Sequence, residues 1–398
     1  MSVNILVTGS GIVSAVGNNR PQTLTSLREQ RSGIGRLRYL KTEHTEFPSG
    51  EVQLSNDEMI QMLNIKADTP TTRTSLMGML AADEALKSAA LHGKSGLHIA
   101  LISGTTVGGM DKSEQYYLDF FANDRYTDYI ATHDCVACTE MIADYFGLFS
   151  SVATISTACS SAANAIMLGA MLLRDGRADV VVAGGSECLT KFHLNGFNTL
   201  MILDRQPCKP FDAHRNGLNL GEGAAYIVLE TEASCRKRGI EPLCRLSGMG
   251  NRCDAFHQTA TSPDGDGAFL AMNEALHNAG LAPSDISYIN AHGTGTQNND
   301  LSEARALQRI FGETIPPFSS TKAFTGHATS AAGSIEAVIS ILALQENFIP
   351  VNLNFTSPMG ELPLLPATAQ TPPRPLQHIL SNSFGFGGND TSLIFSAL

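Results

Sequence analysis

Charged side chains and long apolar runs are both scarce in this sequence of 398 residues. Only 16% of the residues are charged, and 27 basic against 38 acidic side chains give a formal net charge of −11. This acidic balance argues against general nucleic-acid binding and against attachment to a membrane surface. No stretch approaches about 18 apolar residues without a polar interruption, so we expect no transmembrane helix. Tryptophan is absent, which carries no functional message.

Cysteines are few and scattered. The eight lie at positions 135, 138, 159, 188, 208, 235, 244 and 253, and this spacing does not make a disulfide framework in a chain of this length. The amino terminus lacks the basic segment of a signal peptide, so we expect a reduced, cytoplasmic protein. His133, Cys135 and Cys138 could form half of a zinc site, but no second pair follows at finger-like spacing. A helix with ordinary apolar cysteines is the simpler interpretation, and we expect no metal.

Strand-like and helix-like segments alternate along the chain. Strands are expected at Asn4–Thr8, His98–Ser103, Val152–Ile155, Asp179–Ala183, Ala224–Glu230, Ile286–Asn290 and Pro317–Ser320. Helices are expected at Pro21–Gln30, Thr69–Ala90, Ala137–Phe146, Ala268–Ala279 and Leu301–Phe311, and after both Cys159 and His327. A turn at Gly9–Gly11 resembles part of a dinucleotide-binding fingerprint. Ser14 stands where that pattern needs glycine, so the signal is weak.

Two correspondences indicate an internal duplication. GTTVGG at 104–109 follows one strand as GTGT at 293–296 follows another, and similar small-residue helices come after Cys159 and His327. Both helices are too apolar to face water, so they should pack on each other between sheets. The break falls near residues 241–252, without a linker. We therefore expect an α/β protein of two halves, 1–245 and 246–398, which share one core.

The stretch Ser151–Leu173 is the centre of the pattern. A β-branched run precedes Cys159, and a helix crowded with Ala and Ser follows it. The start of a buried helix offers free N–H groups and the positive end of its dipole, and both favour a thiolate. Cys159 is therefore a candidate nucleophile. The alternative is a small buried core cysteine, which is the usual role of a free cysteine.

Three further polar side chains occupy comparable positions. His327 begins the second small-residue helix, His292 ends a strand within NAHGTGT, and Lys322 lies shortly before His327. The ends of elements converge in layered α/β folds, so these groups and Cys159 point to one site. Taken singly, each histidine could be a core residue and the lysine a surface residue.

A cysteine with two histidines has three chemical interpretations. A zinc site lacks a close-spaced ligand pair here. A cysteine protease needs only one histidine, with an Asn or Asp to orient it. An acyl-transfer centre fits better, because two histidines that donate to one oxygen suit a reaction that builds negative charge on a carbonyl.

Several motifs together resemble one family. TACSSAANAI, NAHGTGT, SSTKAFTGH with AAGSIEA, NSFGFGG, VTGSGIVSAVGN and PFDAHRNGLNLGEGAA are similar to the condensing enzymes of fatty-acid and polyketide synthesis. They occur in order over essentially the whole chain and indicate the type I/II β-ketoacyl-acyl-carrier-protein synthases. The resemblance implies a thiolase-like fold of five layers, αβαβα, from two duplicated halves. It also implies a homodimer, with a heterodimer with a related synthase as the alternative.

The resemblance implies roles for individual residues. Cys159 would take the acyl group from the phosphopantetheine thioester of an acyl carrier protein, with its own N–H and that of Phe386 as the oxyanion hole. His292 and His327 would bind the malonyl thioester and stabilise the enolate that decarboxylation leaves. Attack of this carbanion on the acyl-cysteine gives a 3-oxoacyl product. No metal or redox cofactor is implied, because loss of carbon dioxide drives the condensation.

Other residues match supporting positions of the family. Lys322 would hold the charge pattern around the second histidine, and Glu336 would order the site from behind. Thr294 and Thr296 match positions that hydrogen-bond the pantetheine arm. Phe384 and Phe386 match the aromatic gate beside the nucleophile.

The implied partner is a small acidic carrier protein. Arg205, Lys209 and Arg215 form a candidate basic docking patch despite the net charge of −11. A solvated charged loop is the alternative interpretation of these three residues.

The chain departs from the family at several places. GGND at 387–390 replaces the usual GGTN, and a basic cluster of the family is reduced to Lys66 and Arg73. The segment Gly109–Cys138 and the stretch LTKFHLNGFNTLMILD are unlike the housekeeping enzymes, which suggests a specialised polyene or polyketide pathway. The aromatic segment Tyr116–Cys138 either packs as a lid or crosses the dimer interface and lines the acyl tunnel, where flat walls would favour conjugated chains.

Three related classes of protein are alternatives to a condensing enzyme of this group, and a residue of the chain argues against each. A biosynthetic thiolase needs a second catalytic cysteine near the C-terminus, and the last cysteine here is Cys253. Type III synthases carry Asn where His327 stands. A non-catalytic chain-length-factor-like subunit of a heterodimeric synthase would lack the nucleophile, which Cys159 supplies here.

Overall fold

The computed structural model describes residues 3–66, 69–93 and 96–398. The strands are β1 (Ile5–Ser14), β2 (Ile99–Gly104), β3 (Ser151–Ile155), β4 (Val180–Glu187), β5 (Gly223–Thr231), β6 (Cys244–Cys253), β7 (Tyr288–Asn290), β8 (Phe318–Ser319), β9 (His378–Gly385) and β10 (Asn389–Ser396). The helices are α1 (Arg20–Arg28), α2 (Asn56–Leu63), α3 (Arg73–Ser88), α4 (Met110–Tyr116), α5 (Asp119–Ala122), α6 (Cys135–Phe146), α7 (Ser161–Arg174), α8 (Lys191–Thr199), α9 (Glu232–Arg238), α10 (Asp266–Ala279), α11 (Gln297–Phe311), α12 (Lys322–Thr325) and α13 (Ala332–Glu346). Short 3₁₀ turns are η1 (Thr127–Tyr129), η2 (Ala131–His133), η3 (Pro283–Asp285) and η4 (Thr329–Ala331).

The sheet repeats one pairing pattern in the two halves of the chain. Its order is β3-β2-β4-β5-β1-β6-β10-β9-β7-β8, and β1 pairs with β6 where the halves meet. In the first half, β2 is parallel to β3 and β4, while β5 is antiparallel to β4 and β1. In the second half, β7 is parallel to β8 and β9, while β10 is antiparallel to β9 and β6. The predicted duplication is therefore confirmed in strand order and direction.

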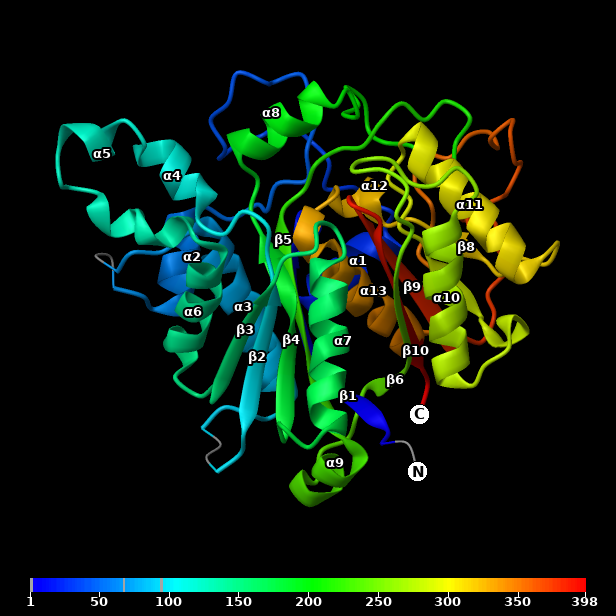
Figure 1. Cartoon of the computed structure of the whole chain (residues 1–398), viewed down its shortest axis with the longest axis horizontal. Coiled ribbons are helices and arrows are strands. Elements are labelled where there is room, and N and C mark those ends of the chain that lie inside the picture. The colour runs from blue at the N-terminus through cyan, green and yellow to red at the C-terminus, as the bar shows by residue number, and fades with distance from the viewer. Residues whose placement is uncertain (1–2, 67–68, 94–95) are drawn as a thin grey trace.

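Helices cover both faces of each half-sheet and form five layers (Figure 1). α3 and α6 cover the outer face of the first half, α7 and α13 lie between the halves, and α10 and α11 cover the outer face of the second. Small residues allow the central helices to pack closely, since a Cβ on Gly333 of α13 would lie 2.9 Å from Cβ of Ala163 of α7. The predicted thiolase-like αβαβα fold is confirmed.

Paired glycines let an outer helix approach each half-sheet. A Cβ on Gly9 or Gly11 of β1 would collide with a backbone carbonyl of α3, and one on Gly248 or Gly250 of β6 would collide with a carbonyl of α10. The turn predicted at the first two glycines is wrong, because β1 continues to Ser14. The repeated glycine pairs are explained by helix packing, and the weak nucleotide-binding signal is not supported.

The two small-residue helices differ in exposure. α13 is buried from Ala332 to Leu344, because it lies between both half-sheets and α7. On α7, Met171 is 46% exposed, and the neighbouring edge strand β3 exposes Val152 at 40%. The expectation that α7 is buried on all sides is therefore wrong for the single chain, since one of its sides faces solvent.

Residues 110–133 form a projecting lid beside the first half-sheet (Figure 1). Within it, Tyr116 stacks on Tyr126 with ring centroids 4.0 Å apart and also packs against Tyr129. Leu118 and Phe121 are 80% and 77% exposed. Part of the aromatic segment therefore packs on itself, and its outer apolar residues stay open to solvent.

The described residues hold no helix that is both long and apolar enough to span a bilayer. Within these same ranges, no group of three or more His, Cys, Asp or Glu side chains is placed to hold a metal ion. His133 instead contacts the Ser113 hydroxyl at 2.8 Å, and Cys138 lies in the core. A division of the chain after residue 245 stays a prediction, because the halves share one sheet and one central helix layer.

Candidate active site

Cys159 lies in a tight turn between β3 and α7. The preceding residue, Ala158, has a φ of +53°, a left-handed conformation that residues with side chains rarely adopt. Ser161 holds the turn, since its hydroxyl donates to Ala158 O (2.6 Å) and accepts from the Thr157 N–H (2.8 Å). The turn presents the thiol to a cavity while leaving it only 5% exposed.

His327 lies against the thiol of Cys159, with 3.1 Å between Nε2 and Sγ. The histidine lies between α12 and η4, so it does not begin the second small-residue helix as predicted. Its backbone N–H donates to Asn219 O (2.8 Å), and its carbonyl accepts from the Gly221 N–H (3.0 Å). The backbone N–H of Phe386 also acts on the sulfur, because it lowers the pKa of the Cys159 thiol.

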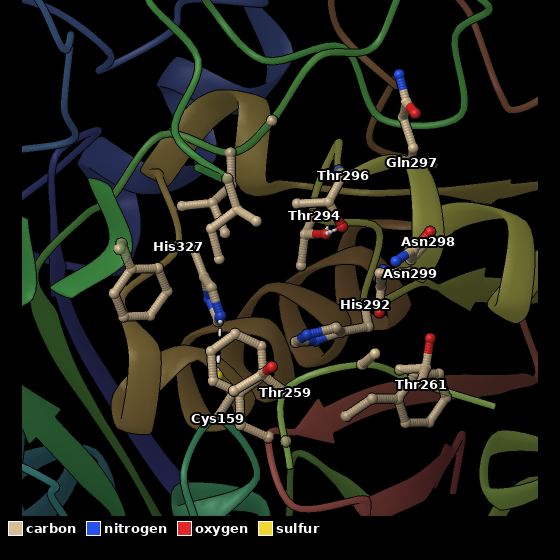
Figure 2. Close-up of a pocket in the computed structure, with 18 of the residues that line it drawn as sticks. Cys159, Thr259, Thr261, His292, Thr294, Thr296, Gln297, Asn298, Asn299 and His327 are labelled. Atoms are coloured by element: carbon tan, nitrogen blue, oxygen red, sulfur yellow. Dashed lines mark hydrogen bonds between the residues drawn. The ribbon is translucent and has the colours of Figure 1, made fainter. Parts of the chain in front are cut away.

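His292 follows β7 and lies edge-on to His327, with ring centroids 5.3 Å apart (Figure 2). Lys322 Nζ lies 3.3 Å from Nδ1 of His292 and is also hydrogen-bonded to the carboxylate of Glu336. An ammonium group can only donate, so Nδ1 accepts and the proton of the neutral imidazole is on Nε2. His292 therefore offers an N–H donor to the cavity that it lines.

Burial decides the protonation states of the site. It lowers the pKa of His292 and of His327 well below the usual value, and Lys322 lowers both further. Burial also raises the pKa of Cys159 to about 11, although Lys322 and the Phe386 N–H oppose this. At neutral pH the site holds a thiol and two neutral imidazoles. The expected thiolate is therefore not the resting form, because removal from water outweighs the nearby donors.

Two buried carboxylates that the sequence analysis missed hold the turns of the site. Glu303 of α11 accepts from the backbone N–H groups of His292 (2.9 Å) and Gly293 (2.8 Å), and burial raises its pKa to about 7. Glu187, at the end of β4, accepts from the Thr106 N–H (2.8 Å) and from the hydroxyl of Ser330 in η4. The only sequence signal was an acidic residue at the end of an apolar strand, and it applied to Glu187 alone.

A cavity of about 330 Å³ leads to the cysteine and the two histidines. Thr294 and Thr296 line its wall with their hydroxyls 2.9 Å apart (Figure 2). Phe384 and Phe386 also line the cavity, and the ring of Phe384 packs against His292 with centroids 5.7 Å apart. Phe386 also stacks on Phe197 of α8, with ring centroids 5.8 Å apart. The sequence analysis noted the stretch around Phe197 as unusual but did not assign it to the site.

Comparison with known proteins identifies the family. Residues 3–234 match the beta-ketoacyl synthase N-terminal domain, and residues 243–356 match the beta-ketoacyl synthase C-terminal domain. The chain belongs to the β-ketoacyl synthase family. The resemblance drawn from the motifs is thereby confirmed.

Relatives of this synthase align over almost its entire length. Nodulation protein E of Rhizobium meliloti (strain 1021) is 33% identical over 99% of both chains. The 3-oxoacyl-[acyl-carrier-protein] synthase 2 of Staphylococcus aureus (strain MRSA252) is 30% identical over 99% of this chain and 98% of its own. One chain of the complex of the ketosynthase ApeO with its chain length factor ApeC from Xenorhabdus doucetiae aligns with a TM-score of 0.86 and 31% identity over 100% of this chain and 98% of its own. The ishigamide ketosynthase/chain length factor aligns with a TM-score of 0.92 and 26% identity over the whole of both.

The synthase is therefore a condensing enzyme, an acyltransferase that elongates acyl chains. A non-catalytic role like that of a chain length factor is no better supported than condensation by these relatives.

The three basic residues predicted for carrier docking do not share one surface. Arg205 is exposed with its guanidinium 6.0 Å from the Phe47 ring centroid, and Lys209 is half-buried. Arg215 is only 4% exposed, and its guanidinium donates to the carbonyls of Asp212 and Gln297. The assignment of Arg215 to a surface patch is wrong, because this side chain ties its loop to the start of α11.

Proposed function

We propose that Cys159 takes the acyl group in the first half of the reaction. The sulfur attacks the thioester carbonyl of an acyl carrier protein, and the bond from that carbonyl to the pantetheine sulfur breaks. The proton of the Cys159 thiol is transferred to the sulfur of the pantetheine, which leaves as a free thiol. The N–H groups of Phe386 and of Cys159 itself would bind the oxyanion, as such donors do in other acyl transfers. The Phe386 N–H opposes the rise in the pKa of the Cys159 thiol, and this effect on the sulfur supports the assignment.

In the second half, the thioester oxygen of malonyl carrier protein would accept hydrogen bonds from His292 and His327. The carboxylate leaves as carbon dioxide, and its electron pair forms the enolate. The enolate carbon attacks the acyl-Cys159 thioester, the carbon–sulfur bond breaks, and the sulfur takes a proton from solvent. The product is a 3-oxoacyl thioester. Lys322 and Glu336 would act through His292, whose Nδ1 the lysine contacts.

One observation carries this proposal: the Cys159 thiol and two neutral imidazoles come together on the wall of one cavity, which Phe386 also lines. Thr294 and Thr296 would bind the pantetheine arm along the cavity wall. The carrier protein would dock near the exposed Arg205 and the half-buried Lys209. The reaction as proposed uses no metal or redox cofactor.

We further propose that the synthase pairs with a second synthase-like chain through the open edge of β3 and the lid. Exposed edge strands favour pairing with another chain, and Val152, Leu118 and Phe121 are exposed there. The partner would be a second copy or a related subunit. Chain length factors accompany the similar ketosynthase ApeO and the ishigamide ketosynthase.

These likenesses also support a polyene or polyketide pathway. The free state of all eight cysteines supports a cytoplasmic location.

The test is a mass-spectrometric survey of the acyl groups that load from carrier protein onto the synthase. We expect one acyl group on the peptide that contains Cys159, and none on Cys159→Ala. Loading on another cysteine, or equal loading of the variant, would contradict the assignment.

A further inference from the structure

Asp390 is a buried carboxyl group where the family usually has an amide. It is the second residue of β10, directly after the glycine turn that carries the Phe386 N–H, and it is 2% exposed. Its Oδ1 has no hydrogen-bond partner within the part of the chain that the structure describes. Burial raises the pKa of Asp390 to about 8, with further contributions from Asp254 and Glu303. The site mechanism does not use this group.

Asp254 connects Asp390 to the glycine turn. Its backbone N–H donates to Gly388 O (3.1 Å), and its carboxylate accepts from the backbone N–H groups of Phe256 (3.1 Å) and Ser262 (2.9 Å). The side chains of Asp254 and Asp390 meet beside Gly267 of α10, where an added Cβ would collide with Asp390 Oδ2 and lie 2.6 Å from Asp254 Cβ. Two carboxyl groups therefore adjoin here, that of Asp390 buried and that of Asp254 half-buried.

No cation balances this pair among the described neighbours. The charged or titratable groups on the elements packed around Asp390 include its direct cross-strand neighbour Arg252 with Arg245 and Cys253 of β6, His257 of the segment after β6, His378 of β9, Asp266, Glu274 and His277 of α10, and Asp300, Glu303, Arg305 and Arg309 of α11. The nearby cations are engaged elsewhere, since Arg252 binds Glu274 (2.9 Å), Arg309 binds Asp266 (2.7 Å) and Arg305 binds Asp264 (3.5 Å). Two adjoining carboxylates repel each other, so the Asp254 and Asp390 carboxyl groups favour a state in which one of them is protonated.

We propose that Asp390 is a positioning residue of the gate: its protonated carboxyl donates to the Asp254 carboxylate and holds residues 254–262 against the turn 386–388. A direct backbone contact supports the same closure, since the Gly387 N–H donates to Gln258 O (2.8 Å). Thr259 and Thr261 from this segment and Gly387 and Gly388 from the turn all line the substrate cavity. We call the contact between Asp390 and Asp254 the latch. The latch therefore sets one wall of the cavity and the position of the Phe386 N–H.

The latch has a defined pH dependence. In the closed form the buried carboxyl of Asp390 keeps its proton up to a high pH. In an opened form water reaches this carboxyl, and it releases the proton near its ordinary pKa. Opening must therefore become easier as pH rises towards about 8, where Asp390 ionises in the closed form as well, and must level off above it. The inference concerns the gate of the proposed oxyanion hole, but its test does not require turnover.

Hydrogen exchange of the intact synthase measures this opening directly. After correction for the intrinsic rate, exchange in residues 254–262 should rise about tenfold between pH 6.5 and 8 and then level off. Asp390→Asn should give slow exchange at every pH, because an amide donates to Asp254 without ionising. Asp390→Ala should give fast exchange at every pH. Asp266→Asn changes an exposed carboxyl at the start of α10 and should keep the wild-type profile.

The proposal is overturned if the wild-type exchange does not change with pH, or if Asp390→Asn keeps the wild-type slope. Peptides of the buried helix α13 report global unfolding and should not change in any variant. The Cys159→Ala protein should show the wild-type exchange profile even though it cannot condense. This outcome separates the latch from the proposed chemistry, since a failure of the cysteine assignment would leave the exchange result intact.

Discussion

Nε2 of His327 and Sγ of Cys159 lie 3.1 Å apart although 168 residues separate them in the sequence. The two residues come from opposite halves of the duplicated fold, so the reaction centre exists only when the halves pack together. Burial keeps the imidazole neutral and the sulfur protonated. Substrate entry must therefore supply the interactions that turn this neutral pair into a reactive one.

Replacement of the nucleophile separates the two halves of the reaction. Cys159→Ala should abolish condensation with the fold intact, because Ala fits a small site with little strain. Cys159→Gln should retain decarboxylation of malonyl carrier protein, since the amide mimics the acyl-enzyme while His292 and His327 still hold the enolate. Carbon dioxide release and product formation are measured in parallel. A well-folded Gln variant without decarboxylation would contradict this division of roles.

Each histidine should matter most after loading. His292→Ala and His327→Ala should each lower the condensation rate by about 10²–10³ or more, the typical loss for one oxyanion donor. Acyl loading of Cys159 should survive better than condensation in both variants. Single-turnover assays with acyl carrier and malonyl carrier resolve the two steps. If the variants fail to load yet decarboxylate normally, the assigned roles are reversed.

The buried Lys322–Glu336 pair should contribute to both stability and catalysis. Lys322→Met leaves the Glu336 carboxylate without its cation, which should cost about 3–5 kcal/mol in unfolding free energy. Because Lys322 lowers the pKa of both histidines, its loss should move the acid limb of the rate profile to higher pH.

Denaturant unfolding and pH–rate profiles measure the two effects. The exposed pair of Lys87 and Asp83 is the control, and Lys87→Met should cost no more than about 0.5 kcal/mol. The double variant Lys322→Met/Glu336→Gln should recover stability without recovering the wild-type pH profile. Full recovery of both would show that the pair has no role beyond folding.

Carrier docking should depend on exposed basic residues near the cavity. Arg205→Glu with Lys209→Glu should raise the carrier KM with little change in kcat, because the loss affects association alone. Rising salt should weaken wild-type binding through screening. Arg174→Glu with Arg177→Glu, at and just after the far end of α7, is the charge-matched control and should change neither constant. An unchanged KM in the double variant would move the docking surface elsewhere.

The lid should influence chain selection if it crosses to the partner subunit. In competition between saturated and polyunsaturated acyl carriers of equal length, we expect a graded preference for the conjugated chain. The preference should be modest, since one misfit in an apolar pocket is worth only about 1–3 kcal/mol. Tyr129→Ala or Ile130→Ala should shift the chain-length cutoff. Equal kcat/KM for both chains and an unchanged cutoff would exclude the lid from selection.

Local pattern alone was sufficient to find most elements and the central cluster. Cys159, His292 and His327 stand beside strands and helices whose periodicity is strong, and small side chains around them mark close packing. The glycines of β1 show where this reasoning fails. Gly9 and Gly11 look like a turn in sequence, but the carbonyls that require them belong to α3, much further along the chain.

Burial and charge environment were decided only by the tertiary structure. Arg215 looks like any loop cation until the fold places it under α11, and Glu303 looks like any helix acid until it receives the His292 N–H. Asp390 differs from the family's amide by one group, yet its raised pKa depends on burial and on the nearby Asp254 and Glu303. These properties depend on long-range neighbours and on exclusion of water, and a pattern of adjacent residues contains neither.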